Sequence, residues 1–146
     1  MSIASQAAAS LRHADSFFIG GEWVKPSSDA EINVIDSTTE EVFLSVAEAQ
    51  ADDISRAVGA ARAAFDQGPW ASLSHAERAG YLRAIAAGLR ERATDLSQVW
   101  PREAGALYSI ATGAAEGAAQ TWEYYAGLAD TYPFEELATQ IGRAHV

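Results

Sequence analysis

The sequence predicts a mixed α/β chain in which a small antiparallel β-hairpin or sheet is followed by about four α-helices. Two observations predict it. Short apolar runs on either side of Gly20-Gly21 indicate strands joined by a tight turn. From 54 to 127 the apolar residues recur every three or four positions, as at Ile54, Val58 and Phe65, which is the spacing of one-sided helices. Several such helices need a shared covering surface, and we expect most of it to lie outside this sequence.

The first strands are predicted at Phe17–Ile19 and Glu22–Val24, because a Gly-Gly pair accepts the positive φ angles of a two-residue hairpin turn. A loop at 26–29 follows. Residues 31–36 alternate polar and apolar as a half-buried strand does, 37–40 have the composition of a turn, and 42–46 form the returning strand.

The first helix is expected to start with Asp52 and Asp53, which suit the positive end of the helix dipole although no strong capping residue precedes them. It stops at Gly68-Pro69. Ser74 and Glu77 have the spacing of a capping box and predict a second helix that runs to about Glu91.

A third helical piece follows a break near Ala93, and we expect a kink or an end at Pro101, with Gly105 closing the segment. The last helix is predicted from Tyr108 to about Asp130. Its many alanines and glycines allow another backbone to approach closely, so we expect a neighbour packed against it.

The composition excludes several classes of function. The chain has 146 residues, 49% of them hydrophobic, which suffices for one domain's core. Its net charge of −10 is scattered, without a basic patch, so we expect no nucleic-acid partner. It has no cysteine and therefore no disulfide, thiolate metal site or thiol nucleophile of its own.

No stretch approaches the ~20 apolar residues of a membrane span, so no membrane partner is expected. Residues 1–16 lack the apolar centre of a secretory signal, and we expect a flexible tail and a cytoplasmic protein. A mitochondrial transit peptide is the less favoured alternative, since this segment is rich in Ser and Ala but contains one Arg.

Few residues could form a site, and each has a simpler explanation. The histidines share no ligand spacing, the adjacent acids cannot converge on one point and are expected at the surface, and Gly20-Gly21 is a turn rather than a phosphate loop. Aromatic residues near the end of the last helix could line a pocket, but core packing is favoured. A hydrolase built on His75 and Glu77 lacks an orienting partner. The residues weighed are His13, His75 and His145; Asp52-Asp53, Glu40-Glu41 and Glu135-Glu136; and Trp122, Tyr124 and Tyr125.

Seven short motifs in order resemble the N-terminal part of the NAD(P)-dependent aldehyde dehydrogenases, from Phe17 to about Thr139. They are Phe-Ile-Gly-Gly-Glu-Trp (18–23), Thr-Glu-Glu-Val (39–42), Asp-Ile-Ser-Arg-Ala-Val-Gly-Ala-Ala-Arg-Ala-Ala-Phe (53–65), Pro-Trp (69–70), Glu-Arg (77–78), Glu-Ala-Gly (103–105) and Tyr-Tyr-Ala-Gly (124–127). The chain departs from the family at Glu40, which replaces a turn glycine and suggests a different turn geometry. It also has Trp100-Pro101 where Glu-Thr is usual, and Ala106 in place of Lys.

The resemblance implies the family's α/β fold, an aldehyde substrate, NAD or NADP as cofactor, and a homodimer or homotetramer. Such enzymes oxidise an aldehyde through a cysteine thiohemiacetal, hydride transfer to the nicotinamide and hydrolysis of a thioester by a glutamate-activated water. The catalytic Cys, Glu and Asn would all lie beyond this sequence. We therefore name no catalytic, cofactor-binding or metal-binding residue, and expect this chain alone to be inactive and to bind no cofactor tightly.

Residues 17–140 are thus interpreted as an incomplete aldehyde dehydrogenase domain with a scaffold role. Residues 141–146, Ile-Gly-Arg-Ala-His-Val, match nothing expected there and resemble a translated sequencing adapter. The alternative is a small non-catalytic helical interaction module derived from the same family. A cooperative melt would favour the module, whereas exposed apolar stripes and molten-globule behaviour would favour the fragment.

Overall fold

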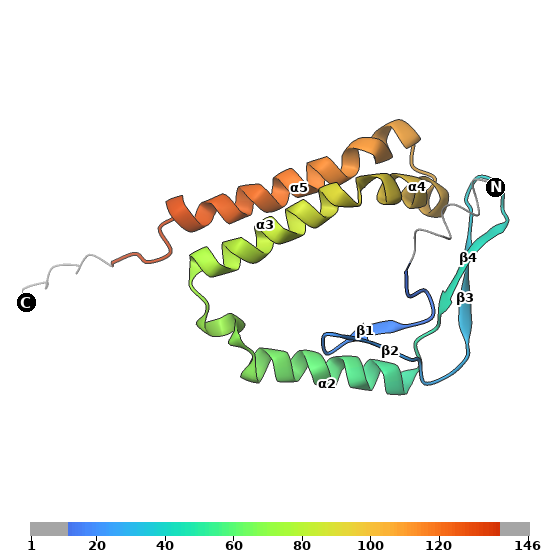
Figure 1. Cartoon of the computed structure of the whole chain (residues 1–146), viewed down its shortest axis with the longest axis horizontal. Coiled ribbons are helices and arrows are strands. Elements are labelled where there is room, and N and C mark those ends of the chain that lie inside the picture. The colour runs from blue at the N-terminus through green and yellow to red at the C-terminus, as the bar shows by residue number, and fades with distance from the viewer. Residues whose placement is uncertain (1–11, 138–146) are drawn as a thin grey trace, which may run out of the picture.

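The computed structural model describes residues 12–137, which form two small β-ribbons and four α-helices arranged around an open centre (Figure 1). The predicted order of strands followed by helices is confirmed. Residues 141–146, expected to be non-native, lie outside the described residues. No helix in the described part of the chain is both long and apolar enough to span a bilayer.

The first ribbon pairs β1 (Phe17–Ile19) with β2 (Glu22–Val24) in antiparallel register, so that Phe18 lies opposite Trp23. Gly20 and Gly21 have φ angles of 64° and 91°, the left-handed backbone that a two-residue hairpin turn requires. The predicted hairpin is therefore confirmed. Just before it, the Ala14 carbonyl accepts a hydrogen bond from the Ala47 amide, which ties this end of the chain to the second ribbon.

The second ribbon pairs β3 (Glu31–Ile35) with β4 (Val42–Ala47), also antiparallel, with a register shift between Val34 and Ile35. Its turn contains Glu40 at a φ of 60°. The expectation of a different turn geometry is wrong, because Glu40 adopts the left-handed conformation that favours glycine. The Asp36 carboxylate accepts hydrogen bonds from the Thr38 and Thr39 amides and holds the turn in place.

Two helices begin and end where their local signals predict. Helix α2 (Ala51–Gln67) stops before Gly68, and a short 3₁₀ helix η1 (Pro69–Ser72) follows. Helix α3 (His75–Glu91) starts at a capping box, in which Ser74 Oγ accepts from the Glu77 amide and the Glu77 carboxylate accepts from the Ser74 amide.

Helix α4 (Ala93–Ala104) continues through Pro101, so the expectation that it could end there is wrong. Gly105, at a φ of 67°, closes the helix as predicted. Hydrogen bonds from the β3–β4 turn stabilise the part of α4 that follows Pro101. The Ser37 amide donates at 2.7 Å to the Arg102 carbonyl, one of those that a helix end leaves without an intrahelical partner. The Ser37 hydroxyl donates at 3.3 Å to the Pro101 carbonyl, which also accepts from the Gly105 amide.

Helix α5 (Tyr108–Thr131) lies alongside α3, and the two form the most closely packed part of the structure (Figure 1). The buried residues of these two helices are all alanines: Ala79 and Ala86 on α3, and Ala111, Ala115, Ala119 and Ala126 on α5. Small side chains let the two helix backbones approach, as the sequence predicts for α5. Phe43 on β4 is the other buried apolar residue of the described chain, so the core is narrow and consists mostly of alanine methyl groups.

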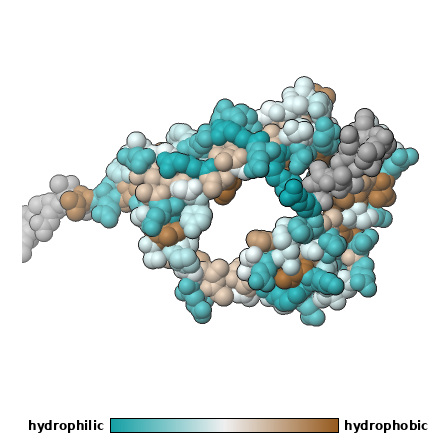
Figure 2. Space-filling model, in the orientation of Figure 1, coloured by the Kyte–Doolittle hydropathy of each residue, from teal (hydrophilic) through white to brown (hydrophobic). Residues whose placement is uncertain are grey.

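Much of the apolar surface is uncovered, and Figure 2 shows an opening through the middle of the molecule. Ile54, Val58 and Phe65, the predicted stripe of α2, are 54%, 62% and 75% exposed. The expectation that a helix stripe lacks a covering partner is confirmed for α2 within the described residues.

The aromatic residues near the end of α5 are also exposed. Trp122, Tyr124 and Tyr125 are 38%, 66% and 57% exposed. The preference for core packing at these positions is therefore wrong in this chain, because no described element covers that side of α5.

Candidate functional site

The two histidines of the described residues, His13 and His75, do not lie together in a site. His13 stacks on Trp23 with ring centroids 4.2 Å apart, and His75 stacks on Phe134 at 3.7 Å. The first pair lies near the start of the described chain, and the second joins the start of α3 to a residue near the end of the described chain. His145 lies outside the described residues. Within residues 12–137 no three His, Cys, Asp or Glu side chains are grouped so that they could hold a metal ion.

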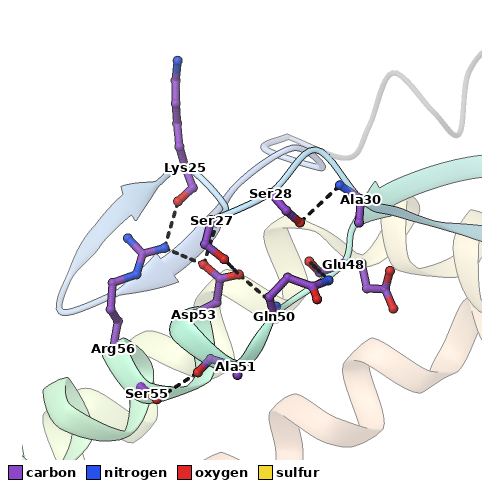
Figure 3. Close-up of polar contacts among 10 residues, drawn as sticks. All are labelled: Lys25, Ser27, Ser28, Ala30, Glu48, Gln50, Ala51, Asp53, Ser55 and Arg56. Carbon is purple, nitrogen blue, oxygen red and sulfur yellow. Dashed lines mark hydrogen bonds and ion pairs between the residues drawn. The ribbon is translucent and has the colours of Figure 1, made fainter.

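Asp53, in the first turn of α2, is the most enclosed acidic group of the described chain (Figure 3). The sequence predicts Asp53 at the surface, and this prediction is wrong because only 1% of the residue is exposed. Its carboxylate accepts hydrogen bonds from the Ser27 amide at 2.9 Å, the Ser27 hydroxyl at 2.8 Å and the Gln50 amide at 2.9 Å. Arg56 adds an ion pair at 2.6 Å and also donates to the Lys25 carbonyl.

These donors lower the pKa of Asp53 from 3.8 to about 2, chiefly through the Gln50 amide and further through Ser27 and Arg56, against the opposing effect of burial. A carboxylate with this pKa and with its oxygens already occupied is a poor general base near neutral pH. Asp53 therefore anchors the loop after β2 to the start of α2 rather than performing chemistry. The spacing of Gln50 and Asp53 is that of a cap, but the Ser27 partner could not be read from a local pattern.

The other adjacent acids are exposed, as predicted. Asp52 and the pairs Glu40-Glu41 and Glu135-Glu136 all lie at the surface of the described chain. None of them contributes to an enclosed cluster, which leaves Asp53 as the exception among the paired acids.

An apolar groove runs along α4 in the described residues, and we call it the α4 groove. One part, of about 510 Å³, lies between α3 and α4 and is lined by Ile85, Leu89, Leu96 and Val99. A second part, of about 280 Å³, extends between α4 and α5 and shares Leu89, Leu96 and Val99. The groove is long, open and almost entirely apolar, which suits a packed protein surface better than a polar substrate.

Comparison with known sequences agrees with the resemblance seen in the motifs. The sequence profile described as the aldehyde dehydrogenase family matches residues 23–145. The chain is 38% identical over 114 residues to aldehyde dehydrogenase 1 of Tanacetum cinerariifolium, covering 77% of this chain and 23% of that protein. It is 32% identical over 124 residues to betaine aldehyde dehydrogenase of Bacillus subtilis, covering 85% of this chain and 25% of that protein.

Solved structures show the same fold. A structure of betaine aldehyde dehydrogenase from Staphylococcus aureus in complex with NAD⁺ matches with a TM-score of 0.81 at 27% identity, over 97% of this chain and 28% of that one. An NAD-dependent aldehyde dehydrogenase from Sinorhizobium meliloti matches with a TM-score of 0.70 at 34% identity, over 75% of this chain and 22% of that one. The chain thus spans about a quarter of the length of these relatives.

Proposed function

The chain belongs to the aldehyde dehydrogenase family, and we propose that it is the N-terminal part of an enzyme that oxidises an aldehyde to a carboxylate with NAD⁺ or NADP⁺. The observation that carries the proposal is the partial match. The fold is shared across nearly all of this chain but only about a quarter of its relatives. The exposed stripe of α2 and the α4 groove are what such a segment would present without its covering parts.

We propose that this segment is a scaffold and that the chemistry belongs to the rest of the enzyme. The chain has no cysteine to serve as the nucleophile. In the described residues the Gly20-Gly21 turn joins two strands and opens no helix, so it does not fit the pyrophosphate of a dinucleotide. NAD⁺, present in the Staphylococcus aureus complex, would be held by residues outside this segment.

Relatives carry the names betaine aldehyde dehydrogenase and aminoaldehyde dehydrogenase, which makes betaine aldehyde the first substrate to try. We further propose a homodimeric or homotetrameric, cytoplasmic enzyme of bacterial type. The oligomeric state rests on the family resemblance, the cytoplasmic location on the composition of residues 1–16, and the bacterial source on the alanine and arginine usage of the sequence.

The test replaces the matched segment of the Bacillus subtilis relative with residues 23–140 of this chain, in one polypeptide that we call the joined protein. Reduction of NAD⁺ with betaine aldehyde by the joined protein, with none by the isolated chain, supports the proposal. Turnover by the isolated chain contradicts it. An inactive, misfolded joined protein together with a cooperative melt of the isolated chain favours the interaction module instead.

A further inference from the structure

One edge of the α3–α5 pair is a line of matched charges, which we call the charged edge. Arg90 on α3 donates to Glu116 at 2.8 Å and to Glu123 at 2.5 Å, both on α5. Further along the two helices, the Arg83 guanidinium of α3 lies 3.7 Å from the Asp130 carboxylate of α5. Because Glu116, Glu123 and Asp130 are spaced by seven residues, they follow one line along α5.

These contacts satisfy the charges without help from another part of the protein. Hydrogen bonds from Arg90 lower the pKa of Glu116 and the pKa of Glu123. The same hydrogen bonds, to Glu123 and Glu116, raise the pKa of Arg90. The side chains of all three remain between about a third and a half exposed, at 37%, 49% and 46%. Matched, hydrated ion pairs are stable facing water, whereas transferring them into a buried interface costs their solvation.

The opposite edge of the same two helices, which we call the apolar edge, carries no such charges. Helical spacing places Ile85 and Leu89 of α3 on this side, together with Trp122 and Tyr125 of α5. Ile85, Trp122 and Tyr125 are 42%, 38% and 57% exposed. The α4 groove continues this surface, since Leu89 lines both of its parts. A contiguous apolar surface of this kind marks a contact with another protein surface.

We propose that the apolar edge and the α4 groove are the surface on which the remaining part of the aldehyde dehydrogenase polypeptide docks, with the charged edge facing solvent. This inference rests on the proposed function and adds which face is covered. The occupant follows from the match to the Staphylococcus aureus enzyme, where the same fold lies within a chain of which it makes up 28%. A second copy of this chain is a poorer occupant, because each copy carries a net charge of −10.

The absence of cysteine in this chain allows a direct labelling test. Ile85→Cys places a thiol on the apolar edge, and Gln120→Cys places a control thiol on the exposed side of α5 near Glu116. Each variant is treated with a thiol reagent as the isolated chain and within the joined protein, and labelling of the introduced cysteine is followed by peptide mass spectrometry. We expect labelling of Ile85→Cys to slow by about tenfold or more in the joined protein, with Gln120→Cys nearly unchanged.

The outcomes separate the two proposals. An active joined protein in which Ile85→Cys reacts as fast as in the isolated chain overturns the docking face and leaves the proposed function standing. Slowed labelling of Gln120→Cys alone would place the interface on the charged edge and also overturns the inference. An inactive joined protein in which both thiols react as in the isolated chain overturns both proposals.

A charge introduced in the groove gives a second measurement. Leu96 lines both parts of the α4 groove and is 43% exposed, so the isolated chain should tolerate Leu96→Asp. In the joined protein the new carboxylate would be buried, and we expect at least a tenfold loss of active enzyme, on the order of the penalty for an unpaired buried charge. Ser109→Asp, at an exposed position of α5, is the matched control. Equal activity of the two variants would contradict the proposal.

Discussion

Ser27 donates two hydrogen bonds to the carboxylate of Asp53, one from its amide and one from its hydroxyl, across 26 residues of sequence. The pair joins the loop after β2 to the first turn of α2 (Figure 3). The Gln50 amide completes the arrangement, so a single carboxylate both caps the helix and fixes the loop. The direction in which α2 leaves the first ribbon therefore depends on this contact.

Asp53→Asn should loosen the start of α2. The amide keeps the shape of the side chain but loses the charge that Arg56 and the three donors stabilise. In the joined protein we expect faster hydrogen exchange at the Ser27 and Gln50 amides and a Tm lowered by several degrees. Asp52→Asn, at the exposed neighbouring position, is the control. Equal effects of the two substitutions would show that Asp53 is not the anchor.

Acid should weaken the same contact over a defined range of pH. The pKa of Asp53 is about 2 in the folded chain against an ordinary 3.8. Because the folded value is the lower one, its contribution to stability is complete above about pH 4 to 5 and is lost as the pH falls towards 2. We expect the Tm of the joined protein to decline over this range, and the joined protein with Asp53→Asn to show a shallower decline. Parallel declines in the two proteins would contradict the assignment.

Local signals in the sequence predict most of the elements. The Gly20-Gly21 turn, the Ser74 capping box and the Gly105 cap each act within a few residues, and all three appear in the structure as expected. The errors involve distant contacts. Asp53 is buried by Ser27, and α4 passes Pro101 while Ser37 bonds its last carbonyls. Neither partner can be identified from spacing alone.

The aromatic residues of α5 show a different reason for failure. Helical spacing marks Trp122 and Tyr125 as one side of a helix, and apolar residues on one side are ordinarily buried. In the described chain they are exposed because no element covers them. Periodicity predicts that the apolar side of a helix packs against another surface, but it does not show whether that surface is formed by the same stretch of sequence.

Ser74→Ala should destabilise the start of α3. The substitution removes the hydroxyl that accepts from the Glu77 amide, and the loss of such a cap costs about 1 kcal/mol. Ser55→Ala is the control, because that hydroxyl only bonds the Ala51 carbonyl of its own helix. Denaturant unfolding of the joined protein, followed by circular dichroism, should show a lower midpoint for Ser74→Ala alone. An unchanged midpoint would mean that the cap contributes little.

Glu40→Gly should stabilise the β3–β4 turn. Glu40 has a φ of 60°, a conformation that costs a residue with a Cβ about 1 kcal/mol and glycine much less. After the greater entropy of an unfolded glycine is counted, we expect a net gain of about 0.5 kcal/mol. Glu41→Gly, the neighbouring exposed residue outside the positive-φ region, should destabilise instead. The unfolding free energy of the joined protein, measured for both variants, should rise with Glu40→Gly and fall with Glu41→Gly, and a fall with both would contradict the prediction.

The most direct test of the whole account is the rate of NAD⁺ reduction with betaine aldehyde, measured for the isolated chain and for the joined protein at equal concentration. We expect no turnover by the isolated chain and measurable turnover by the joined protein, because the proposed function assigns the reacting groups to the rest of the enzyme. Turnover by the isolated chain, which has no cysteine, would contradict it.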